Sequence, residues 1–386
     1  MLKIIFILLF LSNFALGQSF QQLAPFGVDG RDDGVAFSIG KYGYLITGNM
    51  GGAAGTSELL QFDPSQNTWV KKAPFPGIER QYAGQFVVHG KAYLCCGVSF
   101  SNQTLQDVWE YDPQTDHWTQ KQDFPGEERR AFFTFSLLDC GILGTGYNQN
   151  KSFDDCWKYN PLKDSWSQIA SFPGGERREV VGLSLAEKCF AGTGISGSPD
   201  QYNNDFYEYH VMTDTWTRIN DFPGVERAYA VAQGAQFVGI VGSGWKSNGE
   251  FYKDFYQINR NGEWSSFPDF PNGGIRGMSS FTIGNSIYLT TGLTENFARV
   301  VDLYLVEMKS ADQLALYPNP SVGKSVLVAP IGTLFSLYDE KGLLILEQPM
   351  PDVGYYELPD LSAGIYLIKS NKGENGKVLR YVVVDK

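Results

Sequence analysis

Short apolar and aromatic runs alternate with polar, glycine-rich turns along most of the chain. Between residues 82 and 121, for example, such runs occupy 82–88, 92–96, 107–111 and 118–121. Runs of this length, rich in β-branched and aromatic side chains and bounded by Gly, Pro, Asn or Asp, are typical of antiparallel strands. No helical periodicity extends beyond two turns. The pattern therefore predicts an all-β chain with four strands in this segment.

The four-strand pattern repeats about every 49 residues. Each unit has a Trp in its last strand, a Phe six residues later and an Arg soon after it, while a Gly closes its second strand and an acid leads its third. The tryptophans are Trp69, Trp118, Trp166, Trp216 and Trp264. The arginines are Arg31, Arg80, Arg129, Arg177, Arg227 and Arg276. Four strands in a repeat of this length predict the blade of a β-propeller.

The order of these landmarks resembles the Kelch repeat over residues 18–308. An Arg, two strands, a loop and an Asp-x-Trp-x-Tyr-Asp-Pro segment precede the Trp, as at 107–118. The double glycine of that repeat is reduced to one Gly in most units, so the chain is most similar to the galactose-oxidase-type branch of the family. Phe20 lies 49 residues before Trp69, and residues 18–24 are therefore expected to supply the missing outer strand of the last blade. We predict a six-bladed β-propeller closed by the N-terminal strand, which leaves no open sheet edge.

The first seventeen residues are typical of a secretory signal peptide. Lys3 precedes an apolar run at 4–11, and small residues at Ala15 and Gly17 predict cleavage between Gly17 and Gln18. No later stretch is apolar for long enough to span a membrane as a helix. We therefore expect an exported mature chain without a membrane span.

The repeat stops before residue 309, and residues 309–313 are predicted to be a linker. Short strands with Gly and Pro turns predict a small β-sandwich over 314–386. The segments 317–320 (Tyr-Pro-Asn-Pro) and 362–366 (Ser-Ala-Gly-Ile-Tyr) closely resemble the type A C-terminal sorting domain of the type IX secretion system. That resemblance implies that the type IX machinery is a partner, and that the protein is secreted across the outer membrane and then released or attached to the cell surface. An ordinary adhesive sandwich is the alternative.

Composition narrows the possible functions. The 386 residues carry a net charge of −11, which argues against nucleic-acid binding because phosphates require a basic surface. The three His are far apart and no hydrolase or nucleotide-binding motif is convincing, so we expect no cofactor, no metal and no catalytic residue. The five Cys are odd in number and predict buried thiols, although a single disulfide remains an alternative.

The repeated arginines have two interpretations. They would lie at one mouth of the propeller channel, where guanidinium groups bind carboxylates or acidic sugars. Alternatively, each Arg pairs with an acid that leads a third strand, such as Glu58, Asp107 or Asp155, and braces one blade against the next. The periodic recurrence favours this second interpretation, since a ligand seldom has six-fold symmetry. Arg130 and Arg178 break the periodicity and are the better ligand candidates, and Tyr147 and Trp245 in the polar loops suit sugar recognition. The candidate ligand-binding residues are Arg80, Arg129, Arg130, Arg177, Arg178, Arg227, Tyr147 and Trp245.

These features favour a secreted or cell-surface binding module with a glycan or protein ligand. The first alternative is a sugar-modifying enzyme that resembles sialic-acid mutarotases or epimerases, with Glu128 or Glu176 as general base beside an unpaired Arg. The second is a purely structural adhesin. The fold alone does not distinguish these functions.

Overall fold

The computed structural model describes residues 19–27, 29–52, 54–137, 139–185 and 188–308. Towards the C-terminus it describes residues 315–317, 326–328, 333–350, 355–359, 361–370 and 378–383. The predicted signal peptide with its Gly17–Gln18 cleavage site and the predicted linker 309–313 lie outside these residues.

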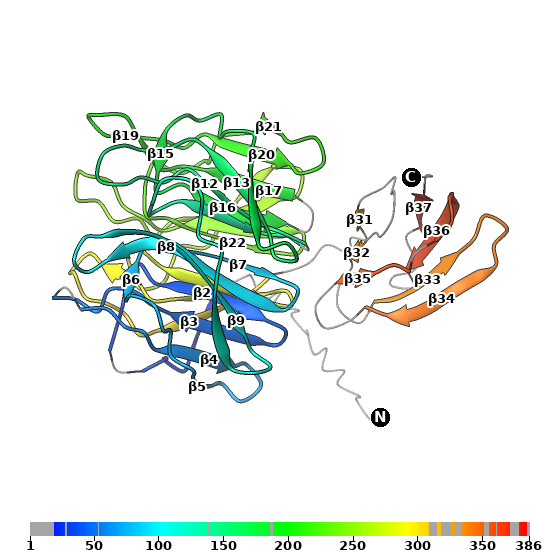
Figure 1. Ribbon diagram of the computed structural model, residues 1–386, viewed down its shortest axis with the longest axis horizontal. Coiled ribbons are helices and arrows are strands. Elements are labelled where there is room, and N and C mark those ends of the chain that lie inside the picture. The colour runs from blue at the N-terminus through cyan, green and yellow to red at the C-terminus, as the bar shows by residue number, and fades with distance from the viewer. Residues whose placement is uncertain are drawn as a thin grey trace, which may run out of the picture.

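The repeats fold into six antiparallel sheets, five with four strands and one with five, and no described residue is helical (Figure 1). The first sheet contains β2 (Val35–Ile39), β3 (Tyr42–Ile46), β4 (Leu59–Asp63) and β5 (Thr68–Lys72). The second contains β7 (Gly84–Val88), β8 (Lys91–Ser99), β9 (Thr104–Asp112) and β10 (His117–Lys121), and the short β6 (Arg80–Gln81) also pairs with β8. The third contains β11 (Phe133–Ser136), β12 (Gly141–Gly144), β13 (Cys156–Asn160) and β14 (Ser165–Ile169).

The other three sheets repeat this order. The fourth contains β16 (Val181–Leu185), β17 (Lys188–Gly192), β20 (Phe206–His210) and β21 (Thr215–Arg218). The fifth contains β22 (Val231–Ala235), β23 (Val238–Gly242), β24 (Phe255–Asn259) and β25 (Trp264–Phe267). The sixth contains β27 (Ser279–Ile283), β28 (Ser286–Thr290), β30 (Leu303–Glu307) and, as its outer strand, β1 (Phe20–Leu23).

The first strands of the six sheets contact one another in sequence order. β2 contacts β7, β7 contacts β11, β11 contacts β16, β16 contacts β22, β22 contacts β27, and β27 contacts β2. Two small sheets lie beyond the ends of these strands. One contains β15 (Arg177–Arg178), β18 (Ile195–Ser196) and β19 (Gln201–Tyr202), and the other contains β26 (Ile275–Arg276) and β29 (Leu293–Thr294).

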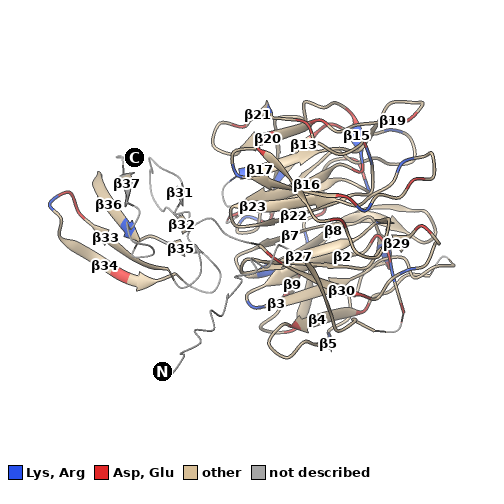
Figure 2. Cartoon of the chain, turned by 180° about the vertical axis from the view of Figure 1, so that it is seen from behind, with Lys and Arg blue, Asp and Glu red and all other residues tan. Residues whose placement is uncertain are grey.

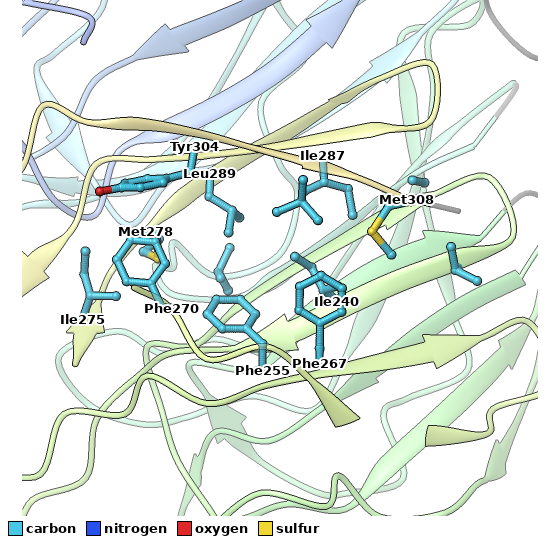
Figure 3. Packing of buried hydrophobic residues seen from close by; sticks show 14 residues of the cluster. Ile240, Phe255, Phe267, Phe270, Ile275, Met278, Ile287, Leu289, Tyr304 and Met308 are labelled. Atoms are coloured by element: carbon cyan, nitrogen blue, oxygen red, sulfur yellow. The ribbon is translucent and has the colours of Figure 1, made fainter. Parts of the chain in front are cut away.

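Aromatic side chains fill the space between neighbouring sheets. Figure 3 shows Phe255, Phe267 and Phe270 facing side chains of the sixth sheet across one such interface. β1 joins this cluster, because the Phe20 ring lies 5.3 Å from that of Phe255 and 5.7 Å from that of Phe267. Phe20 thus occupies the position that a Trp occupies in the other outer strands.

The outer-strand tryptophans also bind the preceding repeat by hydrogen bonds. Trp118 Nε1 donates to Ala73 O at 3.1 Å, and Trp216 Nε1 donates to Ala170 O at 3.0 Å. A second hydrogen bond joins the same two repeats, because Ala73 N donates to Asp116 Oδ1. Each Trp therefore stabilises both the packing and the relative position of two sheets.

All five cysteines are buried and none of them forms a disulfide, as the sequence predicted. None of the described residues belongs to a helix that is long and apolar enough to cross a membrane.

The C-terminal residues form two further antiparallel sheets with a hydrophobic cluster of their own. The first contains β31 (Ala315–Tyr317), β32 (Val326–Val328) and β35 (Tyr355–Glu357); the second contains β34 (Leu344–Pro349), β33 (Leu334–Tyr338), β36 (Gly364–Ser370) and β37 (Val378–Val383).

Candidate functional site

Five of the repeated arginines form ion pairs within their own repeats. Arg80 is fully buried, and its Nη1 and Nη2 lie 2.6 and 2.7 Å from the two carboxylate oxygens of Asp107. Its Nη1 also donates to the Cys96 carbonyl oxygen at 2.9 Å. The same arrangement joins Arg129 to Asp155, Arg177 to Asp205 and Arg227 to Asp254, while Arg31 makes one contact with Glu58.

These pairs also stack on the repeated phenylalanines. The Arg129 guanidinium carbon lies 4.7 Å from the centre of the Phe124 ring and 4.2 Å from that of Phe153. A guanidinium that is enclosed between rings and bound to a carboxylate and a carbonyl has little capacity left for a ligand. The ion-pair interpretation of the repeated arginines therefore applies to four of them: Arg80, Arg129, Arg177 and Arg227.

The sixth repeat departs from this pattern, and the expectation that Arg276 is the sixth member of the series is wrong. Gly194 N donates to the carbonyl oxygen of Arg227, whereas Gly244 N donates to that of Ile275. Ile275 thus takes the backbone position of the arginine, and Arg276 is displaced by one residue. Asp302, the acid of this repeat, instead accepts a hydrogen bond from Gln22.

The residue two positions after the arginine position lies in a left-handed backbone conformation in all six repeats. The φ angles are 54° for Asp33, 54° for Tyr82, 55° for Ala131, 57° for Glu179, 55° for Tyr229 and 63° for Gly277. This conformation is unfavourable for residues other than glycine, so its repetition requires support from the surrounding structure.

Hydrogen bonds between repeats supply that support. Tyr82 N donates to Asp33 O, Ala131 N to Tyr82 O and Glu179 N to Ala131 O. Gly277 N donates to Tyr229 O, and Asp33 N donates to Gly277 O at 3.0 Å, which joins the sixth repeat to the first. These residues line one end of a cavity of about 430 Å³ bounded by the first strands of the six sheets, which we call the channel.

Three further arginines lie at this end of the channel. Arg130 donates to Asn102 Oδ1 at 3.2 Å, and its Nε is buried without a hydrogen-bond partner among the described residues. Arg178 forms an exposed ion pair of 2.7 Å with Asp200. Both guanidiniums lie over the ring of Tyr147, at 4.5 and 5.3 Å from its centre.

Arg276 approaches from the sixth repeat. Its guanidinium lies 3.7 Å from Asp33 and 4.0 Å from Asp32, and it covers the ring of Tyr229 at 4.9 Å. Its Nη1 is buried and has no hydrogen-bond partner among the described residues. In Figure 2, basic and acidic segments both occur around β15 and β29, the short strands that flank this end of the sheets.

Glu179 is the acid within this group of arginines. Its side chain lines the channel, and its Oε1 is buried without a hydrogen-bond partner in the described part of the chain. Burial raises the pKa of Glu179 to about 8, although Arg276, Arg178 and Arg130 oppose the shift. A carboxyl group with this pKa is mostly protonated at pH 7. We call Arg130, Arg178, Arg276, Glu179 and Tyr147 the channel-mouth site.

The structure brings together only some of the residues singled out in the sequence. Arg130, Arg178 and Tyr147 share the channel-mouth site. Trp245 lies beside it, with its ring 6.0 Å from that of Tyr229. Arg80, Arg129, Arg177 and Arg227 are enclosed in the ion pairs described above.

The two glutamates considered as bases, Glu128 and Glu176, are exposed and do not line the channel, whereas Glu179 does. Sequence reasoning missed Glu179 and the role of Arg276. One signal was available: the two residues that follow each repeated arginine differ in chemistry from repeat to repeat, unlike the arginine itself. Such variable positions in an otherwise regular repeat mark the places where a site can differ from the scaffold.

Comparison with known proteins supports the Kelch assignment. The family model described as Kelch motif matches residues 80–125 and 146–173. A solved structure titled "Structure of YjhT" superimposes with a TM-score of 0.62 at 17% sequence identity, covering 73% of this chain and 96% of that chain. No curated protein matches the chain. The chain thus contains Kelch motifs and has the fold of a Kelch-repeat β-propeller.

Proposed function

We propose that this Kelch-repeat propeller is a binding module that captures a ligand with a carboxylate group, such as an acidic sugar, in the channel-mouth site. The observation that carries the proposal is that Arg130 and Arg276 each have a buried guanidinium nitrogen without a hydrogen-bond partner in the described residues, although that of Arg276 lies 3.7 Å from Asp33. Arg178 adds a third cation at the same end of the channel. Guanidinium groups bind carboxylates through paired, charge-assisted hydrogen bonds, which the buried arginines of the repeats already make with aspartate.

Calorimetric titration of the full chain tests this proposal. We expect glucuronic acid or N-acetylneuraminic acid to bind and the neutral sugars glucose and N-acetylglucosamine to bind more weakly. Arg130→Ala should weaken binding of the acidic sugar about 10- to 100-fold, because a hydrogen bond to a charged group contributes about 1.5–3 kcal/mol. Arg218→Ala is the matched control, since Arg218 is an exposed arginine on β21 whose partner is Asp221. Failure of every acidic sugar to bind would contradict the proposal and direct attention to a protein ligand.

A second candidate function is proton transfer on a bound sugar, as in the mutarotases and epimerases that the chain resembles. Glu179 favours this alternative, because an acid–base catalyst works best when its pKa is near the working pH and burial raises the pKa of Glu179 to about 8. The test is the rate of anomer interconversion, followed by NMR. Glu179→Ala should abolish any acceleration by the wild-type chain, and an unchanged rate would exclude this role.

We further propose that the six sheets are the six blades of a propeller closed by the N-terminal strand. The antiparallel pairing of β1 with β30 supports this, with Phe20 opposite Val306 and Leu23 opposite Leu303. The hydrogen bond from Asp33 N to Gly277 O supports it independently. Removal of residues 18–24 should then abolish cooperative unfolding, as measured by scanning calorimetry.

Export is also part of the proposal. We infer that residues 1–17 direct the chain across the inner membrane and that residues 314–386 act as a β-sandwich sorting domain for the type IX system. The two separate C-terminal sheets with their own hydrophobic cluster support a domain boundary before residue 314. In a bacterium that has this system, the full chain should reach the medium or cell surface, and a chain that ends at residue 308 should stay in the periplasm.

A further inference from the structure

Glu179 lies at the centre of the channel-mouth site. Arg130, from the third repeat, Arg178, its neighbour in the chain, and Arg276, from the sixth repeat, all act on its carboxyl group. Asp33 lies in the first repeat, and its pKa is raised by burial, by the charge of Asp32 and, to a smaller extent, by the charge of Glu179. Three tyrosine side chains, each from a different repeat, complete the group of titratable neighbours that interact with Glu179: Tyr82, Tyr147 and Tyr229.

These neighbours leave Glu179 without a fixed partner. In the described part of the chain Arg130 donates to Asn102, Arg178 pairs with Asp200, and Arg276 lies near Asp32 and Asp33. Among these residues none of the three arginines forms a hydrogen bond or ion pair with Glu179. Its backbone, in contrast, is fixed by the bond from Glu179 N to Ala131 O. A carboxyl group on a fixed backbone, with a buried oxygen that has no hydrogen-bond partner among the described residues, is available to donate a hydrogen bond when it is protonated.

We propose that Glu179 is a proton gate for the channel-mouth site: in its protonated form it donates a hydrogen bond to the carboxylate of the ligand, and in its ionised form it repels that carboxylate. This inference rests on the proposed capture of an acidic ligand. The three arginines attract the anion whether Glu179 is protonated or ionised. The affinity for the ligand therefore changes with the protonation of Glu179 alone. The site then releases acidic ligands in alkaline surroundings and retains them at neutral pH.

Glu179 changes charge in a pH interval in which the tyrosines and arginines around it do not. Burial raises the pKa of Glu179 to about 8, so its ionisation falls between pH 7 and pH 9. Burial also raises the pKa of Tyr82, and the charge of Glu179 raises that of Tyr229, so both phenols stay neutral in this interval. The arginines remain charged throughout. Asp33 requires a separate control because burial raises its pKa well above the ordinary value.

The test is the ratio of the dissociation constants of glucuronate at pH 9 and pH 7, measured by calorimetry on the full chain. If only the protonated form binds, the protonated fraction falls from about nine-tenths to about one-tenth, and Kd rises about 10-fold. Glu179→Gln retains a hydrogen-bond donor that does not titrate, so we expect its ratio to be close to 1, whatever its affinity at pH 7. Asp33→Asn should keep the 10-fold ratio.

The outcomes separate the gate from the proposed function. If neither glucuronate nor N-acetylneuraminate binds at either pH, the proposed function is overturned and the gate with it. Binding with equal Kd at pH 7 and pH 9 would overturn the gate alone. A ratio that survives in Glu179→Gln but disappears in Asp33→Asn would also overturn it, by assigning the proton to Asp33. The methyl ester of glucuronic acid carries no charge, and a 10-fold ratio with this probe would exclude repulsion as the cause.

Discussion

Removal of one repeated acid should leave a buried arginine without its counter-ion. In Asp107→Ala, Arg80 loses contacts of 2.6 and 2.7 Å and keeps only its bonds to carbonyl oxygens, while its side chain remains fully buried. Breaking a buried ion pair by removal of one partner costs about 3–5 kcal/mol. Because Asp107 is about one-fifth exposed, water will partly replace it, so we expect the lower value of about 3 kcal/mol.

Thermal unfolding of the full chain, followed by tryptophan fluorescence, measures this loss. For a domain of this size about 3 kcal/mol corresponds to a decrease in Tm of about 6 °C. The chain contains its own control, because Asp302 holds the same position in the sixth repeat but its oxygen accepts from Gln22 in place of an arginine. Asp302→Ala should therefore lower the free energy of unfolding by less than about 1 kcal/mol.

A comparison of Asp107→Ala with Asp302→Ala shows whether the loss of stability comes from the buried ion pair. Equal decreases in Tm for Asp107→Ala and Asp302→Ala would refute the reasoning, because the effect would then come from loss of a loop acid in general. The sixth repeat also indicates how the pair can be replaced. Since Ile275 stands where the other repeats have arginine, Arg80→Ile combined with Asp107→Leu should recover part of the stability lost in Asp107→Ala.

Further predictions concern closure, sheet contacts, thiols and pH. Phe20→Ala should destabilise the chain by about 3 kcal/mol, because it removes a ring packed against three others, and calorimetry would show no change if β1 were dispensable. Trp118→Phe should cost about 1 kcal/mol in urea unfolding through loss of the bond to Ala73 O, and a neutral result would deny that bond a role. The five thiols should react with a chromogenic disulfide only after unfolding; reaction in the native state would contradict their burial.

The last of these predictions is a loss of stability in acid. Burial alone would raise the pKa of Asp107 and Asp155, but their arginine partners outweigh it and lower both values. A carboxylate with a lowered pKa stabilises the folded state above its unfolded pKa, and this contribution disappears as the pH falls through the folded value. The urea midpoint should therefore decrease below about pH 4, and a constant midpoint from pH 7 to pH 3 would contradict these ion pairs.

Much of the scaffold was predictable because every repeat solves the same packing problem. Each Trp must fill a gap beside the preceding sheet and each Arg must neutralise the acid of its own loop, so Trp118 and Arg80 recur with a period that is visible without coordinates. The absence of disulfides among the five cysteines was predictable for a related reason, since a core of this size needs none.

The candidate site was not predictable in the same way. In the other repeats the arginine follows the Phe by five residues, and the same spacing leads from Phe270 to Ile275, which takes the buried position, whereas Arg276 follows one residue later and lies at the channel mouth. Whether an arginine is available for a ligand depends on whether it can reach an acid of its own repeat, and only the backbone position decides that.

Glu179 illustrates the limit most clearly. In the sequence it is one of many glutamates, and its neighbours Arg130 and Arg276 lie 49 and 97 residues away along the chain. Its raised pKa arises from burial at the channel and from charges that other repeats bring to it. The repeat and its strands could be predicted from the amino-acid sequence because they depend on contacts within one unit or between adjacent units, whereas the ion pairs were one of two interpretations that the spacing left open. The tertiary structure alone decided which side chains meet at the channel, because that meeting depends on all six repeats at once.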